Sequence, residues 1–400
     1  MQAIWRRERT MARTWAAVTA CALSLAVMAK AATWQIDTVD PTEVGQSSSM
    51  KIDRDGNAHV CYVGGQGRVL KYAYWDHTNK RWFTMVLDDG PNACSLTLDS
   101  KQHPHICYAD YGTAYGSKLR YAHWDGKEWK KEAIRLNSEV IASYSSIGLD
   151  ANDNPTIAFY EYRGARGTNN HIRLRTVRWN GKYWEVTTID GQEGSGKMNN
   201  MAVDSNGHLH LAYANVASGE MRYAFWNGES WSLETIEGRP QTQQYVGLTC
   251  GIAIDKADRP HVVYLNATTL QIKYAVRIDG HWTHQVVDAI GGATEDFDRS
   301  SIAFDEQGRV YLGYYDPGRG ILKVAHKEGP NWMVEIVDGD GSGFTSSMQI
   351  DRGVLWISYA GLDSGTLKVA HRELNASDAA LPPTSEAHAA TARNPESVKK

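Results

Sequence analysis

The sequence predicts an all-β chain built from seven copies of one unit of about fifty residues. An Asp that ends the first strand of each unit recurs seven times, at intervals of 46, 51, 54, 51, 50 and 46 residues: Asp53, Asp99, Asp150, Asp204, Asp255, Asp305 and Asp351. A Trp that opens the last strand recurs in six units: Trp82, Trp129, Trp184, Trp231, Trp282 and Trp332. Units of this length with four strands form β-propellers, so we predict a seven-bladed β-propeller of antiparallel blades.

The seventh Trp lies at the other end of the chain and predicts how the ring closes. Residues 34–40, which begin with Trp34, have the same pattern as residues 332–338, whereas the last unit ends at Glu373 without a Trp. We therefore expect the N-terminal strand to complete the last blade.

Each unit contains four short strands separated by turn signals. In the second unit the strands are expected over 95–99, 105–108, 119–124 and from Trp129 onward. Three units have an Asp-x-x-Gly turn after the first strand, in which the Asp side chain can accept backbone amides and Gly supplies a positive φ. An Asn-Gly or Asp-Gly turn precedes the fourth strand.

The two ends of the chain are predicted to lie outside the propeller, which we place at residues 32–374. Residues 1–31 combine Arg residues with an apolar run and a small-x-small cleavage site, as in a signal peptide. A lipoprotein attachment at Cys21 is the alternative. The apolar run is too short to span a membrane. Residues 375–400 are expected to form a disordered tail. The mature protein should be secreted or periplasmic.

Charge and cysteine content limit the classes of partner. The formal net charge is −4, and removing residues 1–31 takes away five basic residues and one acidic residue, which gives −8. This balance argues against nucleic acid or anionic membrane as a partner. Four cysteines remain after processing, namely Cys61, Cys94, Cys107 and Cys250. Their even number permits disulfides, whereas their equivalent positions in the repeat suggest small buried residues in place of Ser or Ala. No C-x-x-C spacing indicates a zinc site.

Two columns of polar residues repeat through the blades. A His starts the second strand in four units (His59, His105, His210 and His261), and we expect it to bond the nearby turn or the column Asp. A basic residue fills all seven third strands: Lys71, Arg120, Arg175, Arg222, Lys273, Lys323 and Lys368. An interstrand ion pair is the first interpretation of this column, and a positive ring that meets an anionic polymer is the second.

Function is expected where the repeat is broken, on the face built by the loops between strands two and three and by the connectors. The third unit departs most, with Phe159 in place of the column Tyr. The candidate ligand-binding residues are Asp110, Tyr111, Tyr115, Tyr144, Glu161, Tyr315, Asp316 and Arg319. Aromatic rings stack on the apolar faces of sugars, and Arg, Asp and Glu bind hydroxyl or carboxylate groups.

No cofactor is expected, although one acidic stretch resembles half of a calcium loop. Residues 338–343 match D-x-D-x-S-G, with Asp338 and Asp340 as the candidate ligands. Gln349 stands where the bidentate acid of such a loop is expected. Calcium is therefore kept as an alternative.

The motif apolar-Asp-x-x-Gly-x-x-His-apolar-x-Tyr, found at 52–62 and 203–213, resembles the repeats of exported bacterial propellers that are loosely grouped with sialidase-like proteins. The resemblance covers residues 34–374. The motif departs from the sialidase Asp-box, S-x-D-x-G-x-x-W, and the arginine triad of sialidases cannot be assigned. The repeats are also similar to those of propeller lectins and propeller polysaccharide lyases.

Three functions follow from these observations. The first is a non-catalytic propeller that binds a glycan or polysaccharide, or a surface protein, through its loop face. The second is a lyase acting on a uronate-containing polymer, with Tyr162 or His171 as base or acid and Arg163 or Arg166 holding the carboxylate. The third is a protein-interaction scaffold.

Overall fold

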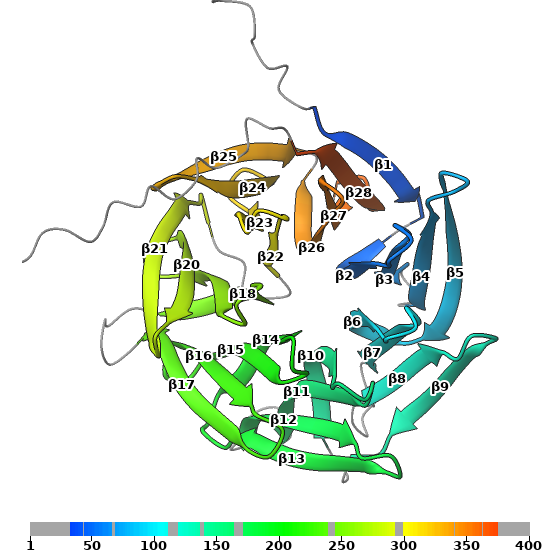
Figure 1. Ribbon diagram of the computed structural model, residues 1–400, viewed down its shortest axis with the longest axis vertical. Coiled ribbons are helices and arrows are strands. Elements are labelled where there is room, and N and C mark those ends of the chain that lie inside the picture. The colour runs from blue at the N-terminus through cyan, green and yellow to red at the C-terminus, as the bar shows by residue number, and fades with distance from the viewer. Residues whose placement is uncertain are drawn as a thin grey trace, which may run out of the picture.

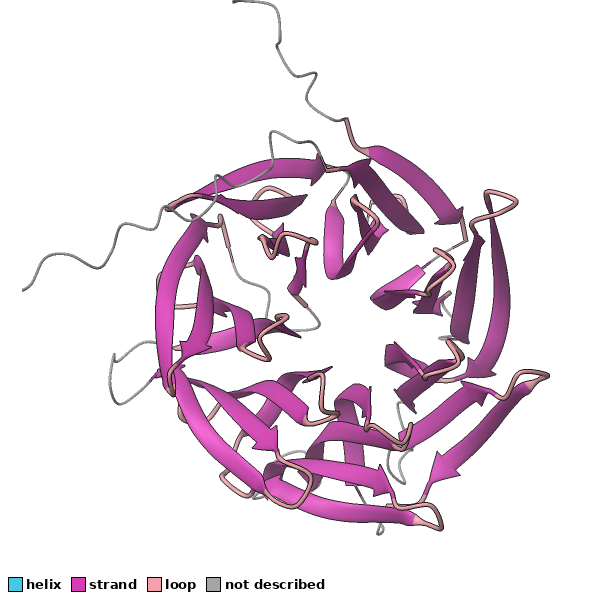
Figure 2. Ribbon diagram, viewed as in Figure 1, coloured by secondary structure: helices cyan, strands magenta, loops and turns pink. Residues whose placement is uncertain are grey.

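The computed structural model describes residues 33–42, 44–65, 69–110, 119–136, 140–163, 171–238, 245–292, 299–339, 341–361 and 363–374. In this part of the chain, 28 strands form seven four-stranded antiparallel sheets, arranged as blades around a central axis (Figure 1). Figure 2 shows strands and connecting loops in these residues, and no helix. The predicted seven-bladed propeller is confirmed. No helix in these ranges is long and apolar enough to cross a membrane.

In blades one to six the strands follow one another in chain order from the axis outward. Blade one contains β2 (Val44–Ile52), β3 (Ala58–Gly64), β4 (Val69–Asp76) and β5 (Arg81–Asp89). Blade two contains β6 (Pro91–Leu98), β7 (Pro104–Asp110), β8 (Leu119–Trp124) and β9 (Trp129–Ile134). Blade three contains β10 (Val140–Leu149), β11 (Pro155–Arg163), β12 (His171–Trp179) and β13 (Trp184–Asp190). Blades four and five contain β14 (Ser195–Val203), β15 (Leu209–Asn215), β16 (Glu220–Trp226) and β17 (Trp231–Gly238); and β18 (Val246–Ile254), β19 (Pro260–Asn266), β20 (Gln271–Ile278) and β21 (His281–Ala289). Blade six contains β22 (Ser301–Phe304), β23 (Val310–Asp316), β24 (Ile321–Glu328) and β25 (Asn331–Asp338).

Blade seven is assembled from both ends of the propeller. Its first three strands are β26 (Ser342–Asp351), β27 (Val354–Gly361) and β28 (Thr366–Glu373), and its outermost strand is β1 (Gln35–Asp40). The register between β1 and β28 sets Ile36 opposite Ala370. The predicted closure of the ring by the N-terminal strand is therefore confirmed.

The hydrophobic core is divided among the seven boundaries between blades. Each boundary contains one cluster of buried side chains contributed by both neighbours. The cluster between blades one and two, for example, contains Leu70 and Leu87 of the first blade and Ile106 and Tyr108 of the second. Burial of apolar surface thus holds neighbouring blades together, which explains why the apolar columns repeat.

The column Asp organises the turn between the first two strands of a blade. In blade one, Oδ1 of Asp53 accepts the backbone N–H groups of Asp55 and Asn57, at 2.9 and 2.8 Å. The equivalent Asp in the next five blades accepts the same two amides. Because such a bond satisfies amides that the turn leaves unpaired, this column is structural.

The His column is structural as well. Each of its four imidazoles lies between the column Asp and a Tyr of the third strand, as in blade two, where Nδ1 of His105 is 2.5 Å from the hydroxyl of Tyr121 and Nε2 is 3.5 Å from Asp99. Burial lowers the pKa of His105 to about 4, and it also lowers the pKa values of His210 and His261. The expected hydrogen bond to the column Asp is present for His59 and His261, at 3.3 and 3.1 Å, whereas Nε2 of His105 and of His210 lies 3.5 and 3.4 Å from the carboxylate.

This burial makes the stability of the propeller depend on pH. Between pH 6.5 and 4, the unfolded state binds a proton that the folded state excludes from His105, so stability is lost as the pH falls. The shift from 6.5 to about 4 corresponds to about 3 kcal/mol for this group. Urea unfolding at pH 7 and pH 4 should show this loss. His105→Thr, which copies Thr156 of blade three, should weaken the pH dependence, and an unchanged dependence would contradict the assignment.

The basic column forms ion pairs across the blade boundaries. At six boundaries, an acid at the end of one blade accepts hydrogen bonds from a Tyr of the second strand and a Lys or Arg of the third strand in the next blade. These acids, with their partners, are Asp40 (Tyr62, Lys71), Asp88 (Tyr108, Arg120), Asp190 (Tyr213, Arg222), Glu237 (Tyr264, Lys273), Asp288 (Tyr314, Lys323) and Asp338 (Tyr359, Lys368). We call this arrangement the inter-blade clamp. This clamp confirms that the basic column forms ion pairs, and it argues against the alternative of a positive ring that binds an anionic polymer.

Blade three lacks the Tyr of the clamp and obtains its acid differently. Phe159 occupies the Tyr position, and Arg175 bonds the buried Glu161 of its own blade at 2.8 Å. The acid of the clamp comes six residues after the Trp in the other blades, whereas Arg135 stands at that spacing after Trp129. Glu161 thus replaces a carboxylate that blade two does not supply.

A disulfide joins the first two blades. Cys61 of β3 and Cys94 of β6 are bonded, with their Cα atoms 6.4 Å apart. Cys107 and Cys250 are buried free thiols, and burial raises their pKa values to about 11 and about 12. The pairing that the sequence left open is therefore a bond between neighbouring blades.

Candidate functional site

The residues predicted to catalyse a lyase reaction lie at the ends of two paired strands, or outside the described part of the chain. The β11–β12 register sets Arg163 opposite His171 and Tyr162 opposite Ile172. Arg166 lies outside the described residues, as do Tyr111 and Tyr115 of the predicted ligand site. Asp110 ends β7.

Several predicted ligand-binding residues of blades three and six are engaged in the fold. Glu161 bonds Arg175 and lies 3.3 Å from Nε of Arg173. Tyr144 is buried and packs edge-on against Tyr160, with ring centroids 5.9 Å apart. Glu161 and Tyr144 therefore contact other residues of the fold, whereas the sequence predicted that they would contact a ligand.

Blade six shows the same pattern at its predicted site. Asp316 is buried, lies 2.8 Å from Nζ of Lys323, and accepts the backbone N–H of Gly291 at 2.9 Å. These partners lower its pKa although burial opposes them. Tyr315 is also buried, whereas the side chain of Arg319 is 67% exposed. Of these three residues, Arg319 is the one that solvent reaches.

The calcium alternative rests on one described residue. Asp338 belongs to the inter-blade clamp and accepts hydrogen bonds from Tyr359 and Lys368, at 2.8 and 3.0 Å. Asp340 lies outside the described residues. Within the described ranges, no group of three His, Cys, Asp or Glu residues is placed to hold a metal. Calcium binding therefore stays a prediction from the sequence.

The Trp column reveals a break in the repeat that the loops do not show. At five boundaries the indole N–H of the column Trp donates to a side chain in the outer strand of the preceding blade. The donors and acceptors are Trp34 to Glu335, Trp82 to Asp37, Trp184 to Glu132, Trp282 to Glu234 and Trp332 to Gln285. Each acceptor is the third residue after the column Trp of its own blade, so this position can be compared among the blades.

At the boundary of blades one and two, this acceptor is absent. Met85 occupies the acceptor position, and the indole of Trp129 forms no hydrogen bond with the described part of the chain. At the boundary of blades three and four, Thr187 occupies the acceptor position, and the indole of Trp231 also forms no hydrogen bond with the described residues. A Met side chain is apolar and flexible, so the first boundary combines an unpaired donor with an apolar wall.

A cavity of about 390 Å³ opens at this boundary, and we call it the aromatic cleft. Its lining combines aromatic and apolar side chains with a few polar groups: Asp53, His59, Tyr72, Tyr74, Phe83, Thr84, Met85, Gln102, His103, Pro104, Trp124 and Trp129. Phe83 and Met85 are 43% and 46% exposed. Both project from β5, the outer strand of blade one, whose neighbour β4 supplies the two tyrosines.

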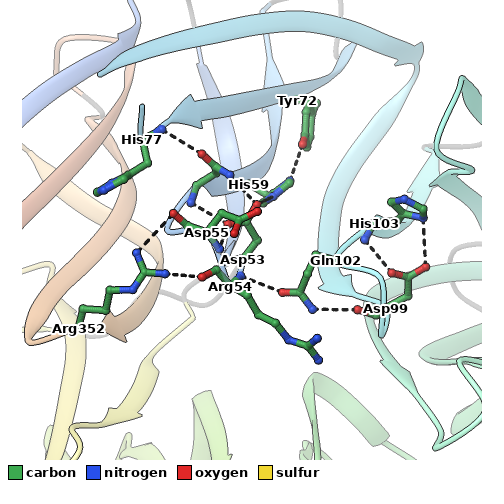
Figure 3. Close-up of polar contacts among 11 residues, drawn as sticks. Asp53, Arg54, Asp55, His59, Tyr72, His77, Asp99, Gln102, His103 and Arg352 are labelled. Carbon is green, nitrogen blue, oxygen red and sulfur yellow. Dashed lines mark hydrogen bonds and ion pairs between the residues drawn. The ribbon is translucent and has the colours of Figure 1, made fainter. Parts of the chain in front are cut away.

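The polar side of the cleft is held in place by turn contacts, which Figure 3 shows. Gln102 accepts the backbone N–H of Arg54 through Oε1, at 3.0 Å, and donates through Nε2 to the backbone oxygen of Asp99. His103 lies 3.4 Å from the Asp99 carboxylate. On the other side of blade one, Arg352 donates to the backbone oxygens of Arg54 and Asp55. The turns that frame the cleft are thus fixed to both neighbouring blades.

The arrangement can bind a molecule that has an apolar face and a hydrogen-bond acceptor. Trp129 lies edge-on to Tyr72, with centroids 5.0 Å apart, so its orientation is fixed by packing. Its unpaired indole N–H can then donate to a ligand oxygen. Tyr72, His59 and Asp53, which line the cleft, form a chain of hydrogen bonds, but the same chain recurs at His261 in blade five and therefore belongs to the structural His column.

Sequence reasoning missed the aromatic cleft, although a signal for it exists. The residue three positions after the column Trp is Asp37, Met85, Glu132, Thr187, Glu234, Gln285 and Glu335 in the seven cases. The residue one position after the Trp is Phe83 in blade one and Lys130 in blade two. Met333 of blade six is also apolar one position after its Trp, but blade one is apolar at both positions, which marks the boundary that follows it.

Comparison with solved structures finds proteins of similar fold, among them lectins and polysaccharide lyases. A PL25 ulvan lyase, solved with -[GlcA(1-4)Rha3S]- bound, is 12% identical with a TM-score of 0.57, over 83% of this chain and 94% of that chain. The polysaccharide lyase Uly1 is 11% identical with a TM-score of 0.53, over 85% and 91%. The six-bladed fucose-binding lectin of Aleuria aurantia is 13% identical with a TM-score of 0.50, over 76% and 98%.

Neither a protein-family model nor a curated protein matches the sequence. At the identities of the solved structures, the likeness shows the fold alone. The chain is a seven-bladed β-propeller whose structural neighbours include propeller lectins and polysaccharide lyases.

Proposed function

We propose that the protein binds glycans without catalysis, and that the aromatic cleft between blades one and two is the binding site. The observation that carries this proposal is Met85, which removes the acceptor of the Trp129 indole at this boundary. Structural neighbours that bind or cleave carbohydrates support the same ligand class. The proposal places the site between two blades, whereas the sequence favoured the loop face.

Sugars suit the chemistry of this cleft. A pyranose ring has an apolar face of C–H groups that packs on an aromatic ring, and Tyr74, Phe83 and Trp129 offer such rings. Its hydroxyl and ring oxygens can accept the indole N–H, and Gln102 and His103 supply further polar groups at the edge. A volume of about 390 Å³ is within the usual range for ligand pockets.

The test compares the protein with two variants of one residue on an array of immobilised glycans. Met85→Glu copies Glu132, Glu234 and Glu335 of other blades, so it should give Trp129 its acceptor and place a charge in the cleft. Retention of the bound glycan should fall about tenfold, because the glycan loses the hydrogen bond from the Trp129 indole, which is worth about 1.4 kcal/mol. Met85→Leu should bind like the wild type. Equal binding by Met85→Glu would exclude this cleft as the site.

A polysaccharide lyase is the second candidate, because the β11–β12 register brings the backbones of Arg163 and His171 opposite each other, beside Tyr162. A lyase acting on a uronate polymer creates an unsaturated product, so absorbance near 235 nm should rise when the protein meets acidic polysaccharides. Tyr162→Phe should then abolish turnover. A flat trace together with glycan retention favours the binding function, and a flat trace without retention favours a protein-interaction scaffold.

Export to an oxidising compartment is part of the proposal. Disulfides persist mainly in such compartments, and the bond between Cys61 and Cys94 is consistent with one. Processing after residue 31 gives a soluble protein, whereas processing before Cys21 gives a lipid-modified one. The mass of the mature N-terminal peptide distinguishes these outcomes.

A further inference from the structure

The centre of the ring contains a second cavity, with a polar lining and a volume of about 570 Å³. It lies along the innermost strands of the blades, which surround the axis in Figure 1. Hydroxyl and amide side chains from five different blades face it: Ser49, Ser95, Asn200, Ser301 and Ser347. Unlike the aromatic cleft, it offers hydrogen bonds from several directions.

The charged residues that line this central cavity in the described part of the chain are both basic. They are Lys51 and Arg299, and no described Asp or Glu lines it. Neither cation forms an ion pair with a carboxylate in the described ranges of the chain. Burial lowers the pKa values of both groups, as expected for cations that have lost water without gaining an anion.

Lys51 is a departure from the repeat. The strand register sets it opposite His59, and the same register position holds Thr97, Gly148, Ala202, Ala253, Ala303 and Gln349 in the other blades. Small or neutral residues therefore satisfy the structural needs of this position. A partly buried Lys has a desolvation cost, and Lys51 has no carboxylate partner among the described residues, which suggests a role in binding.

Arg299 reaches the opposite side of the ring from its own blade. It precedes β22 of blade six, and its guanidinium donates to the backbone oxygens of Cys94 in blade two and Ser145 in blade three, at 3.4 and 3.0 Å. Each of its terminal nitrogens makes one of these bonds. A guanidinium has five N–H groups, so these contacts orient it and leave donors for a planar anion.

We propose that the central cavity binds a small anion through Arg299 and Lys51. The ligand class is an inorganic oxyanion or a small molecule that carries a carboxylate, sulfate or phosphate group, because these groups accept from both cations and from the surrounding hydroxyls. A cavity lined by one sign of charge also concentrates anions from solution. Among the described residues the two cavities share Gln102, and the anion proposal does not depend on glycan binding in the aromatic cleft.

The test measures the thermal midpoint of the full-length mature protein with three probes at low millimolar concentration: sodium sulfate, sodium phosphate and sodium glucuronate. Ionic strength is kept constant with sodium chloride. Saturation at ten times the Kd should raise the midpoint by roughly 2–4 °C. Titration calorimetry should give one anion per chain. A response to sulfate or phosphate alone indicates an inorganic ligand, and a response to glucuronate indicates an organic acid.

Lys51→Ala is the informative variant, because Ala occupies the same position in three other blades and should preserve the fold. We expect it to weaken anion binding at least tenfold, while the exposed Lys127→Ala leaves binding unchanged. Arg299→Gln should remove binding. No midpoint shift in the wild type, or an equal shift in Lys51→Ala, would overturn the proposal.

The two proposed sites can fail independently. The Lys51→Ala variant should bind the glycan array like the wild type. The Met85→Glu variant should show the same rise in thermal midpoint when anions are added. Loss of both properties in either variant would contradict the separation of the sites.

Discussion

Replacing Asp190 with alanine is expected to reduce the free energy of unfolding by about 3–5 kcal/mol, the usual cost of breaking a buried ion pair. The Asp190 carboxylate is buried and accepts hydrogen bonds from Arg222 at 2.7 Å, Tyr213 at 2.8 Å and Ser195 at 2.9 Å. Its removal leaves the Arg222 guanidinium buried without its carboxylate. Urea unfolding, followed by Trp fluorescence, measures the loss.

The control is Glu229→Ala, which removes an exposed carboxylate from a turn of blade four, the blade that contains Arg222. It should change the free energy by no more than about 0.5 kcal/mol. Replacing Asp190 and Arg222 together with leucine should recover part of the loss, because no unpaired charge remains. If Asp190→Ala were as stable as Glu229→Ala, the inter-blade clamp would not hold the blades together.

Removing the disulfide by Cys61→Ser and Cys94→Ser should have a similar effect. The bond closes a segment of 33 residues, so its loss increases the entropy of the unfolded chain by an amount equal to about 4 kcal/mol. Cys107→Ser is the matched control, because Cys107 occupies the same position in blade two and is a free thiol. The denaturant midpoint of the double variant should fall well below that of this control. Equal midpoints would show that the bond contributes nothing.

Much of the fold could be predicted because one set of residues recurs in every blade. The spacing of the column Asp and Trp residues gave the number of blades, and Trp34 gave the closure of the ring. Each of these features depends on contacts close in sequence or on the repeat itself. Such contacts can be recognised without coordinates, because every blade needs them.

The partners across blade boundaries were harder to predict. Asp190 and Arg222 are 32 residues apart and belong to different blades, so neither strand alone shows that they form an ion pair. The regular distance of six residues from Trp184 to Asp190 was visible, but its meaning depends on which strands face each other.

The candidate site differed from the prediction for a related reason. Sequence reasoning looked for unusual loops and chose Glu161 and Asp316, which the structure places in buried ion pairs. The aromatic cleft arises from Met85, a single apolar residue in an otherwise regular strand, and from the Trp129 that faces it. The packing of one blade against the next shows that this substitution leaves the indole of Trp129 without an acceptor among the described residues.

The most direct test of the central claim is a nuclear magnetic resonance titration of the indole N–H groups in protein labelled with nitrogen-15 at tryptophan. Trp129→Phe assigns the resonance of interest, and Trp282, whose indole donates to Glu234 at 3.0 Å, is the internal control. We predict that a glycan retained on the array shifts the Trp129 resonance in a saturable manner and leaves the Trp282 resonance in place. A glycan that binds without moving the Trp129 resonance would contradict the assignment of the aromatic cleft.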